Sequence, residues 1–473
     1  MDRKKYLVKN TALFALNSIG TKLIIFLLVP IYTKSLVTSD FGVADLVTTL
    51  AAIVVPIITL NIHEAVMRFS LDDDADQDKI LSIGITVIVL SALLGIGIIP
   101  ISKIWALLRP YSMFFYFYCV TQGIYNICVS VLRGKEMLVP YAVCNILVTF
   151  TGAILNIIFL VYFKWGVQGY FLGFIISYIV GCLYSVLSSK MYKTIGRFII
   201  DKPLAGKMCA YSLVLIPNSL MWWIMNASDR LMVIAMVGPA ANGIYATSYK
   251  IPSAISTMSV IFNQAWSYSA IHEENSSDKN AFNEKMYNYL FEFQLIITSS
   301  LLFIIKPLMK VYVAEDYYTA WKYIPPLLVG YFFMSLGTFF STQYTVKKDS
   351  KGFLISGSVG AAINVILNLI LIPRIGPLGA AIATAMAYFS VFAYRVFDTR
   401  KYFSIKWIST KKVISVLVLI CMALVNYLNH KFELLILFAF LCIAVVLARK
   451  SIVFIIGSFY SKIRKKLPQK NSK

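Results

Sequence analysis

The sequence predicts an all-helical integral membrane protein with about 14 spans, built as two six-helix repeats followed by two more helices. The chain is 59% hydrophobic and only 14% charged, with a mean hydropathy of +0.75. Soluble domains average about 45–50% apolar and about 25% charged residues. Apolar runs of about 20 residues, the length that crosses a bilayer as a helix, recur along the chain. The runs are continuous and do not alternate with polar residues, which excludes a transmembrane barrel.

Fourteen runs follow one another along the chain. We expect spans at residues 10–32, 41–63, 80–101, 112–132, 140–163, 167–188, 209–237, 241–269, 287–312, 323–345, 353–372, 377–397, 412–429 and 432–449. The first run is expected to be a span and not a cleaved signal peptide, because it is long enough to cross the bilayer and contains no small-residue cleavage site.

The positive charge is distributed in a way that indicates orientation. Most of the 44 Lys and Arg residues lie in segments that face one side if the spans alternate, among them 189–208 and the basic tail. The positive-inside rule then places both termini in the cytoplasm. The net charge of +22 does not indicate a nucleic-acid partner, because the basic residues separate apolar runs and do not form one face.

Metal and cofactor sites are not expected. The seven cysteines are scattered without a CxxC pair and mostly lie inside apolar runs, where they behave as small core residues. The three histidines lie far apart in the sequence, so no metal-ligand spacing is present.

Short motifs recur in the two halves of the chain. "LVTSDFGVADLV" and "VGPAANGIYATS" place Gly42 and Gly243 at matching points, and "WGVQGYFLGFIISY" resembles "IGPLGAAIATAMAY". An even number of spans in each repeat gives both repeats the same topology. We therefore expect an N-terminal six-helix lobe at 1–188, a basic cytoplasmic connector at 189–208, a second six-helix lobe at 209–398, and two extra helices with a basic tail at 399–473.

Ionisable residues inside spans are candidates for function, because each costs about 2.5–3.5 kcal/mol to insert. Lys22 is near the middle of the first span, and Asn17 on a neighbouring turn makes its face polar. We expect that face to line a cavity. Glu64 and Arg68 have the spacing and order of a helical ion pair, although Arg68 is also placed to reach a phosphate at the cytoplasmic mouth.

Asp229 and Arg230 are adjacent in an otherwise apolar run. Adjacent helical residues point about 100° apart, so each needs its own partner. Lys250 lies at a similar depth on the next span, and we hypothesise an Asp229–Lys250 contact that leaves Arg230 to face the cavity or the opposite lobe. The alternative is that Arg230 closes an outer gate by pairing with an acid of the first half such as Asp45, which is itself either a helix N-terminal acid or a cavity residue.

The deepest charges in this interpretation are Lys22, Arg230 and Lys250 against the single acid Asp229. A net positive cavity suits a pyrophosphate, whereas an exporter of organic cations needs acids. Aromatic and amide side chains that can contact sugars are present in "FNQAWSYS", where Gln264 and Trp266 are substrate candidates.

Four stretches resemble one transporter family: "YTKSLVTSDFGVADLV" (32–47), "LNIHEAVMRFS" (60–70), "SDRLMVIAMVGPAANGIYATSYKI" (228–251) and "GPLGAAIAT" (376–384). With the span pattern, they resemble the polysaccharide-export branch of the multidrug/oligosaccharidyl-lipid/polysaccharide exporter superfamily. The resemblance implies two lobes around a central cavity that opens alternately to each side of the bacterial cytoplasmic membrane. It implies a flippase for sugar repeat units of O-antigen type on an undecaprenyl-pyrophosphate carrier, with membrane lipids and polysaccharide polymerase machinery as partners.

Three other functions stay open. A cation-coupled multidrug antiporter of the same superfamily would need buried acids in its first lobe, where the first span offers only Lys22. A membrane enzyme would need paired carboxylates, for which the loop "SLDDDADQDK" is the only candidate, and we interpret it as a solvated loop without catalytic function. A lipid scramblase or scaffold is the third possibility.

Overall fold

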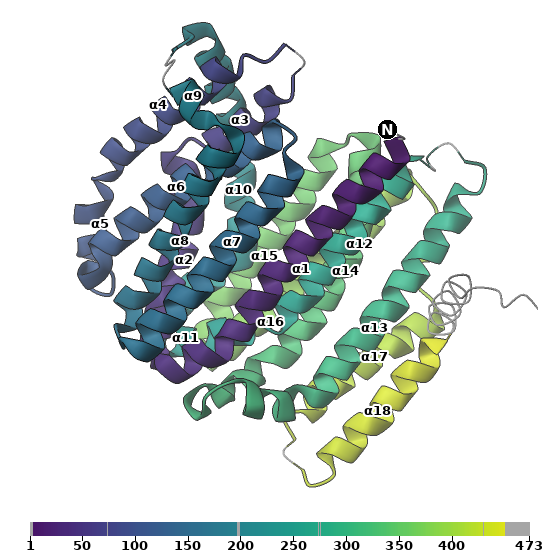
Figure 1. Cartoon of the computed structure of the whole chain (residues 1–473). Helices are drawn as coiled ribbons and strands as arrows, with labels where there is room; N and C mark the ends of the chain where they lie inside the picture. The colour runs from purple at the N-terminus through teal and green to yellow at the C-terminus, as the bar shows by residue number, and fades with distance from the viewer. Residues whose placement is uncertain are drawn as a thin grey trace, which may run out of the picture. The chain divides into compact units, whose positions relative to one another are not determined.

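The computed structural model describes residues 3–72, 74–195, 199–272, 274, 276–428 and 430–449. Within these ranges the side chains of 3–18, 194–195, 218, 222, 264–265, 268 and 272 are not described. The described residues form helices and no strand (Figure 1). The α-helices are α1 Arg3–Ser35, α2 Thr38–Ile58, α3 Ile62–Ser70, α4 Gln77–Gly95, α5 Ile98–Ile104, α6 Ser112–Gly134, α7 Leu138–Ile157, α8 Gly166–Ser189, α9 Met191–Ile195, α10 Lys202–Met236, α11 Pro239–Ser248, α12 Pro252–His272, α13 Lys279–Tyr312, α14 Ile324–Lys347, α15 Ser350–Ile375, α16 Pro377–Asp398, α17 Thr410–Val425 and α18 Glu433–Leu447.

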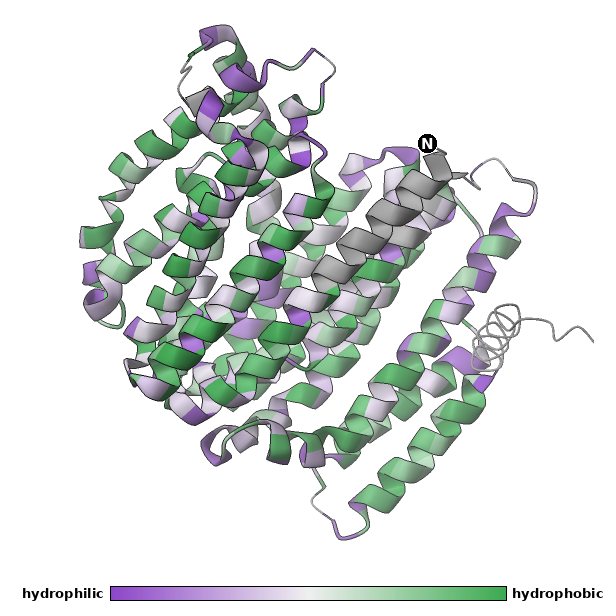
Figure 2. Cartoon of the chain, in the orientation of Figure 1, coloured by the Kyte–Doolittle hydropathy of each residue, from purple (hydrophilic) through white to green (hydrophobic). Residues whose placement is uncertain are grey.

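Nine helical segments in the described part of the chain are long and apolar enough to cross a membrane, or ten if the bent pair Lys202–Met221 and Trp223–Met236 forms one span. The prediction of an all-helical membrane protein is therefore confirmed, and Figure 2 shows hydrophobic residues along the helices. The number fourteen stays a prediction. Helices α17 and α18 have 16 and 15 residues, shorter than a full span.

Two of the expected spans contain breaks. The run 41–63 is interrupted after Ile58, where Leu60 and Asn61 have the left-handed backbone conformation. The run 241–269 is divided into α11 and α12, and α12 begins at Pro252. Proline is favoured at the first position of a helix, since its missing N–H group has no partner there in any case. Hydropathy averaged over the length of a span does not register such breaks, because one or two polar residues such as Asn61 or Lys250 are outweighed by the apolar turns on both sides.

The helices group by their contacts into two units. Unit 1 comprises 1–250, 310–320 and 360–383, and unit 2 comprises 251–309, 321–359 and 384–473. This grouping does not test the predicted division into repeats.

Unit 1 contains the close contacts of α1 with α7, of α7 with α8, and of α2 with α10 and α11. Glycines permit some of these contacts. A Cβ atom on Gly173 of α8 would lie 2.4 Å from the side-chain oxygen of Asn156 on α7. Asn156 in turn donates to the Tyr32 hydroxyl of α1 at 3.0 Å. A small residue and one amide thus hold three helices together.

In unit 2, α14 packs against α12 and α17, and α17 forms a hairpin with α18. Lys306 of α13 connects this hairpin to the rest of the unit. It forms an ion pair with Glu433 of α18 at 2.7 Å, and its ammonium lies 4.3 Å from the centre of the Trp321 ring.

Candidate functional site

The two glycines of the repeated motif lie against each other in unit 1. A Cβ atom on Gly42 would lie 1.9 Å from the Pro239 carbonyl oxygen, and one on Gly243 would lie 2.0 Å from the Thr38 carbonyl oxygen. These are the closest approaches that any glycine makes within the described residues. The contact is reciprocal, because each helix presents its glycine to the first turn of the other. It brings the backbones of α2 and α11 together and sets the position of every side chain one turn further along.

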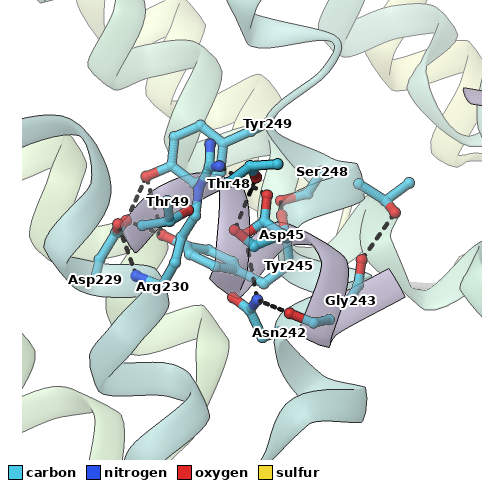
Figure 3. Close-up of polar contacts among 12 residues, drawn as sticks. Asp45, Thr48, Thr49, Asp229, Arg230, Asn242, Gly243, Tyr245, Ser248 and Tyr249 are labelled. Atoms are coloured by element: carbon cyan, nitrogen blue, oxygen red, sulfur yellow. Dashed lines mark hydrogen bonds and ion pairs between the residues drawn. The ribbon is translucent and has the colours of Figure 1, made fainter. Parts of the chain in front are cut away.

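One turn after Gly42 on α2 is Asp45, whose side chain is buried (Figure 3). Its carboxylate accepts a hydrogen bond from the Arg230 guanidinium of α10 at 2.9 Å and from the Asn242 amide of α11 at 3.2 Å. The guanidinium also lies 4.8 Å from the centre of the Tyr249 ring. The structure thus forms the Arg230–Asp45 ion pair, which was one of the two alternatives for Arg230.

Asp229 is almost fully buried and points away from this ion pair, as the geometry of adjacent helical residues requires. Its carboxylate accepts hydrogen bonds from the hydroxyls of Tyr245, at 2.7 Å, and Tyr249. Both tyrosines belong to the motif "GPAANGIYATSY" at α11 and its C-terminal end. The Asp229–Lys250 contact stays a prediction, whereas the two tyrosines are partners that the sequence reasoning missed.

A cavity of about 410 Å³ lies in the same unit. Lys250 is the one Lys, Arg, Asp or Glu side chain among the described residues that line it. The rest of the lining is aromatic, small polar or aliphatic: Thr21, Ile25, Leu28, Val29, Tyr32, Phe41, Thr48, Tyr125, Asn145, Val148, Thr149, Gly152, Ala153, Tyr170, Phe174 and Tyr178. Thr48 lies one turn from Asp45 on α2, so the cavity adjoins the Asp45–Arg230 ion pair.

The tyrosines of this lining were not predicted from the sequence. Tyr170, Phe174 and Tyr178 recur every four residues and therefore share one face of α8. Tyr125 of α6 donates a hydrogen bond to Asn145 of α7 at 2.7 Å, which fixes both polar groups at the lining. The spacing within "GYFLGFIISY" was the available indication of an aromatic face.

Lys22 of α1 is exposed and is not among the described residues that line the cavity, although its neighbour Thr21 is. Of the other predicted cations, Lys250 lines the cavity and Arg230 pairs with Asp45. The structure also corrects the balance of charge. Asp45 joins Asp229 as a second buried acid, where the sequence reasoning counted one.

Four further predictions need a correction or lie outside the described residues. Arg68 pairs with Asp72 and not with Glu64, because it lies in the last turn of α3 beside the acidic loop, whereas Glu64 lies beside His63 in the first turn. Trp266 is buried in unit 2 and stacks on Phe339 with 4.6 Å between the ring centres, so it belongs to an aromatic core. The side chains of Asn17 and Gln264 lie outside the described residues.

A buried cation of unit 2 was missed. Arg395 of α16 is 6% exposed and donates hydrogen bonds to the Ser356 hydroxyl at 3.0 Å and the Gly337 carbonyl at 3.1 Å. Arg395 lies near the end of the expected span 377–397, where a charged side chain ordinarily reaches water, so the sequence did not indicate that it is buried. In the part of the chain that the structure describes, no group of three or more His, Cys, Asp or Glu side chains is arranged to hold a metal ion.

Solved transporter structures resemble this fold over most of its length. The lipid II flippase MurJ in an inward closed conformation matches with a TM-score of 0.67 and 14% identity, over 96% of this chain and 100% of that one. An inward-facing multidrug resistance MATE family transporter of the MOP superfamily matches with a TM-score of 0.63 and 13% identity, over 82% and 94%. A MOP superfamily transporter from Pyrococcus furiosus matches with a TM-score of 0.59 and 14% identity, over 85% and 96%. At these identities the likeness concerns the fold.

Sequence comparisons give the family. An uncharacterized membrane protein of Methanocaldococcus jannaschii is 29% identical over 106 residues, which are 22% of this chain and 20% of that relative. The family model described as polysaccharide biosynthesis protein matches residues 7–268, more than half of the chain. This family and the fold agree with the expectation of a transporter and not an enzyme. The chain belongs to the polysaccharide biosynthesis protein family and has the fold of the MOP superfamily transporters.

Proposed function

We propose that this protein translocates undecaprenyl-pyrophosphate-linked oligosaccharide repeat units from the cytoplasmic to the outer leaflet of a bacterial inner membrane. In this proposal twelve of fourteen spans form two six-helix lobes, 1–188 and 209–398, that alternate in access, two further spans follow them, and both termini are cytoplasmic. The polymerase machinery for the polysaccharide would receive the product. The observation that carries the proposal is the cavity of unit 1, in which one lysine faces a lining rich in tyrosine.

The chemistry of that lining matches the two parts of such a substrate. Sugar rings pack their C–H faces on aromatic rings, and their hydroxyls bond to amides and hydroxyls, which Asn145 and Thr149 supply. The pyrophosphate needs cations in a place with little water, where their attraction is stronger than in bulk solvent. Lys250 lines the cavity, Lys22 follows the lining residue Thr21, and Arg230 is paired with Asp45, one turn from the lining residue Thr48.

The Asp45–Arg230 pair gives this mechanism a gate. Arg230 is held by Asp45 at 2.9 Å while α2 and α11 touch at their glycines. Moving α2 away from both α10 and α11 would release the guanidinium of α10 from the carboxylate of α2 and make its charge available to a phosphate. We propose that closure of the outer side of the cavity and binding of the pyrophosphate compete for the same cation.

A cation-coupled multidrug antiporter is the second candidate, favoured by the fold that this chain shares with MATE transporters. A cationic drug would be attracted by a carboxylate in the cavity lining. Among the described lining residues the charged group is a lysine, which repels such a substrate.

The test is transport by the purified chain in liposomes. Fluorescent lipid-linked oligosaccharide is incorporated, and its appearance in the opposite leaflet is followed by an impermeant quencher. We expect Lys250→Gln and Lys22→Gln to slow flipping at least tenfold, while the exposed control Lys310→Gln keeps the wild-type rate. Wild-type flipping by both cavity variants would remove the cationic mechanism. Gradient-driven extrusion of ethidium, with no flipping, would favour the antiporter.

A further inference from the structure

A second cavity, of about 640 Å³, lies in unit 2 where α13 and α17 begin. Four lysines and two glutamates line it, together with small polar and aromatic residues: Ala281, Glu284, Lys285, Asn288, Tyr289, Phe291, Glu292, Lys406, Ser409, Lys411 and Lys412. It is separate from the tyrosine-lined cavity of unit 1, with which it shares no lining residue.

The two glutamates already have partners in the wall. Glu284 of α13 accepts a hydrogen bond from the Lys406 backbone N–H at 3.2 Å, and Glu292 is paired with the Lys411 ammonium. Lys412 is also held, because its ammonium donates to the Lys406 carbonyl at 2.8 Å and lies 4.5 Å from the centre of the Tyr287 ring. These contacts attach the segment before α17 and the first turn of α17 to α13, so specific side-chain contacts hold the wall of the cavity in place.

The charge that faces solvent at this cavity is positive. Lys285 and Lys406 are exposed, so their ammonium groups are accessible from outside the helices. Ser409 caps α17 by accepting from the Lys412 N–H at 3.4 Å, and the first turn of this helix therefore adds a positive dipole end. Exposed cations beside a helix N-terminus form an environment that binds phosphate.

The position of the cavity along the helices matches the depth of a lipid head group. On α13 the lining residues end at Glu292, and the apolar run follows. Figure 2 shows hydrophilic residues toward this end of α13 and hydrophobic residues beyond. On α17, the residues directly after the lysines are exposed and apolar: Val413, Ile414 and Leu417 are 42%, 43% and 53% exposed. The lysines thus lie where the polar end of α17 meets its exposed apolar face. This arrangement is complementary to an amphiphile that has a phosphate and acyl chains.

We propose that this cavity binds the phosphate of an anionic glycerophospholipid whose acyl chains lie along the exposed face of α17. Lys285 and Lys406 would hold the phosphate, and Tyr289 and Asn288 would lie beside the glycerol region. In the orientation proposed above, this lipid belongs to the cytoplasmic leaflet. The site is independent of the transported substrate, because it lies in unit 2 and uses none of the residues proposed for transport.

Native mass spectrometry of the full chain in a neutral detergent tests this. Phosphatidylglycerol is titrated against wild type, the double variant Lys285→Gln with Lys406→Gln, and a control double variant, Lys310→Gln with Lys351→Gln, which removes two exposed lysines elsewhere in the chain. A lysine near an anionic membrane surface contributes about fivefold to binding, so we expect about 25-fold weaker binding in the cavity variant and less than twofold in the control. The conservative double variant Lys285→Arg with Lys406→Arg should keep the binding of wild type.

Two further ligands identify the source of the phosphate. Phosphatidylcholine with the same acyl chains should bind more weakly and respond little to either pair of substitutions. Inorganic phosphate at millimolar concentration should not displace bound phosphatidylglycerol. Equal binding of phosphatidylglycerol by both double variants, or equal affinity for both lipids, would overturn the proposal. Binding of inorganic phosphate without retained lipid would also overturn it, because the site would then be one for a soluble anion.

Discussion

The Asp45–Arg230 pair should contribute more to stability than any exposed ion pair of this chain. We consider Asp45→Asn, which removes the charge and keeps the shape, and Arg230→Met, which keeps the apolar length of the side chain. The Asp45 side chain is 5% exposed and the Arg230 side chain 19%, with 2.9 Å between the charged atoms. Removing one partner of such a pair leaves the other charge buried, which costs about 3–5 kcal/mol.

The two substitutions should therefore not be additive. Once one charge is removed, the loss of the other removes a group that is already destabilising, so the double variant should be more stable than the sum predicts by about 2–3 kcal/mol. Arg230→Met should cost more than Asp45→Asn by about 1 kcal/mol, because the guanidinium also lies over the Tyr249 ring.

The assay is reversible unfolding in mixed micelles of a neutral detergent and dodecyl sulfate, followed by circular dichroism. Arg68 and Asp72 give a matched control, since their side chains form an ion pair but are 52% and 42% exposed. Arg68→Met and Asp72→Asn should couple by less than about 1 kcal/mol, as exposed pairs do. A coupling energy for Asp45 and Arg230 no larger than that of the control would refute our reasoning about this pair.

Three further predictions use the same unfolding assay or a simple variant of it. Gly42→Ala should destabilise the protein by about 1–3 kcal/mol, because the added methyl group collides with the backbone of α11 and no side-chain rotation can relieve the collision. Gly206→Ala has open space around it and should be neutral or stabilising, so equal effects of the two substitutions would contradict the close contact. Tyr245→Phe and Tyr249→Phe each remove one hydrogen bond to a buried carboxylate and should cost about 1.5–3 kcal/mol singly, and a double variant no less stable than either single variant would argue against this arrangement. Glu433→Gln removes the acid that pairs with a lysine of α13, and limited proteolysis between α17 and α18 should become faster; an unchanged cleavage rate would show that the pair does not hold the hairpin.

The helical membrane class could be predicted from the sequence because hydropathy is a local property. Each apolar run carries its own evidence for burial in lipid, and its length alone indicates a helix that crosses the bilayer. Breaks within runs could not be predicted in the same way. The left-handed residues Leu60 and Asn61 and the end of α11 before Pro252 depend on backbone geometry that leaves hydropathy unchanged.

Pairings near in sequence were not safer to predict than distant ones. Glu64 and Arg68 have good helical spacing, yet Arg68 pairs with Asp72, because the side chain at the end of α3 is closer to the exposed loop. Trp266 appeared suitable for stacking on a sugar, yet it is equally suitable for stacking on Phe339, and burial decides between these uses. A residue type alone does not distinguish core from cavity.

For Asp229 and Arg230 the sequence by itself determined that the two charges diverge, since that follows from the 3.6-residue turn of any α-helix. It also predicted that Gly42 and Gly243 occupy matching places in the two halves of the chain, since each lies in a similar short motif. Only the tertiary structure decided that these glycines touch, and that their contact brings Asp45 to Arg230 and the two tyrosines to Asp229. The physical reason is that a buried charge takes as its partner whichever polar group the packing of neighbouring helices brings within reach, and that packing depends on residues far from it in the chain.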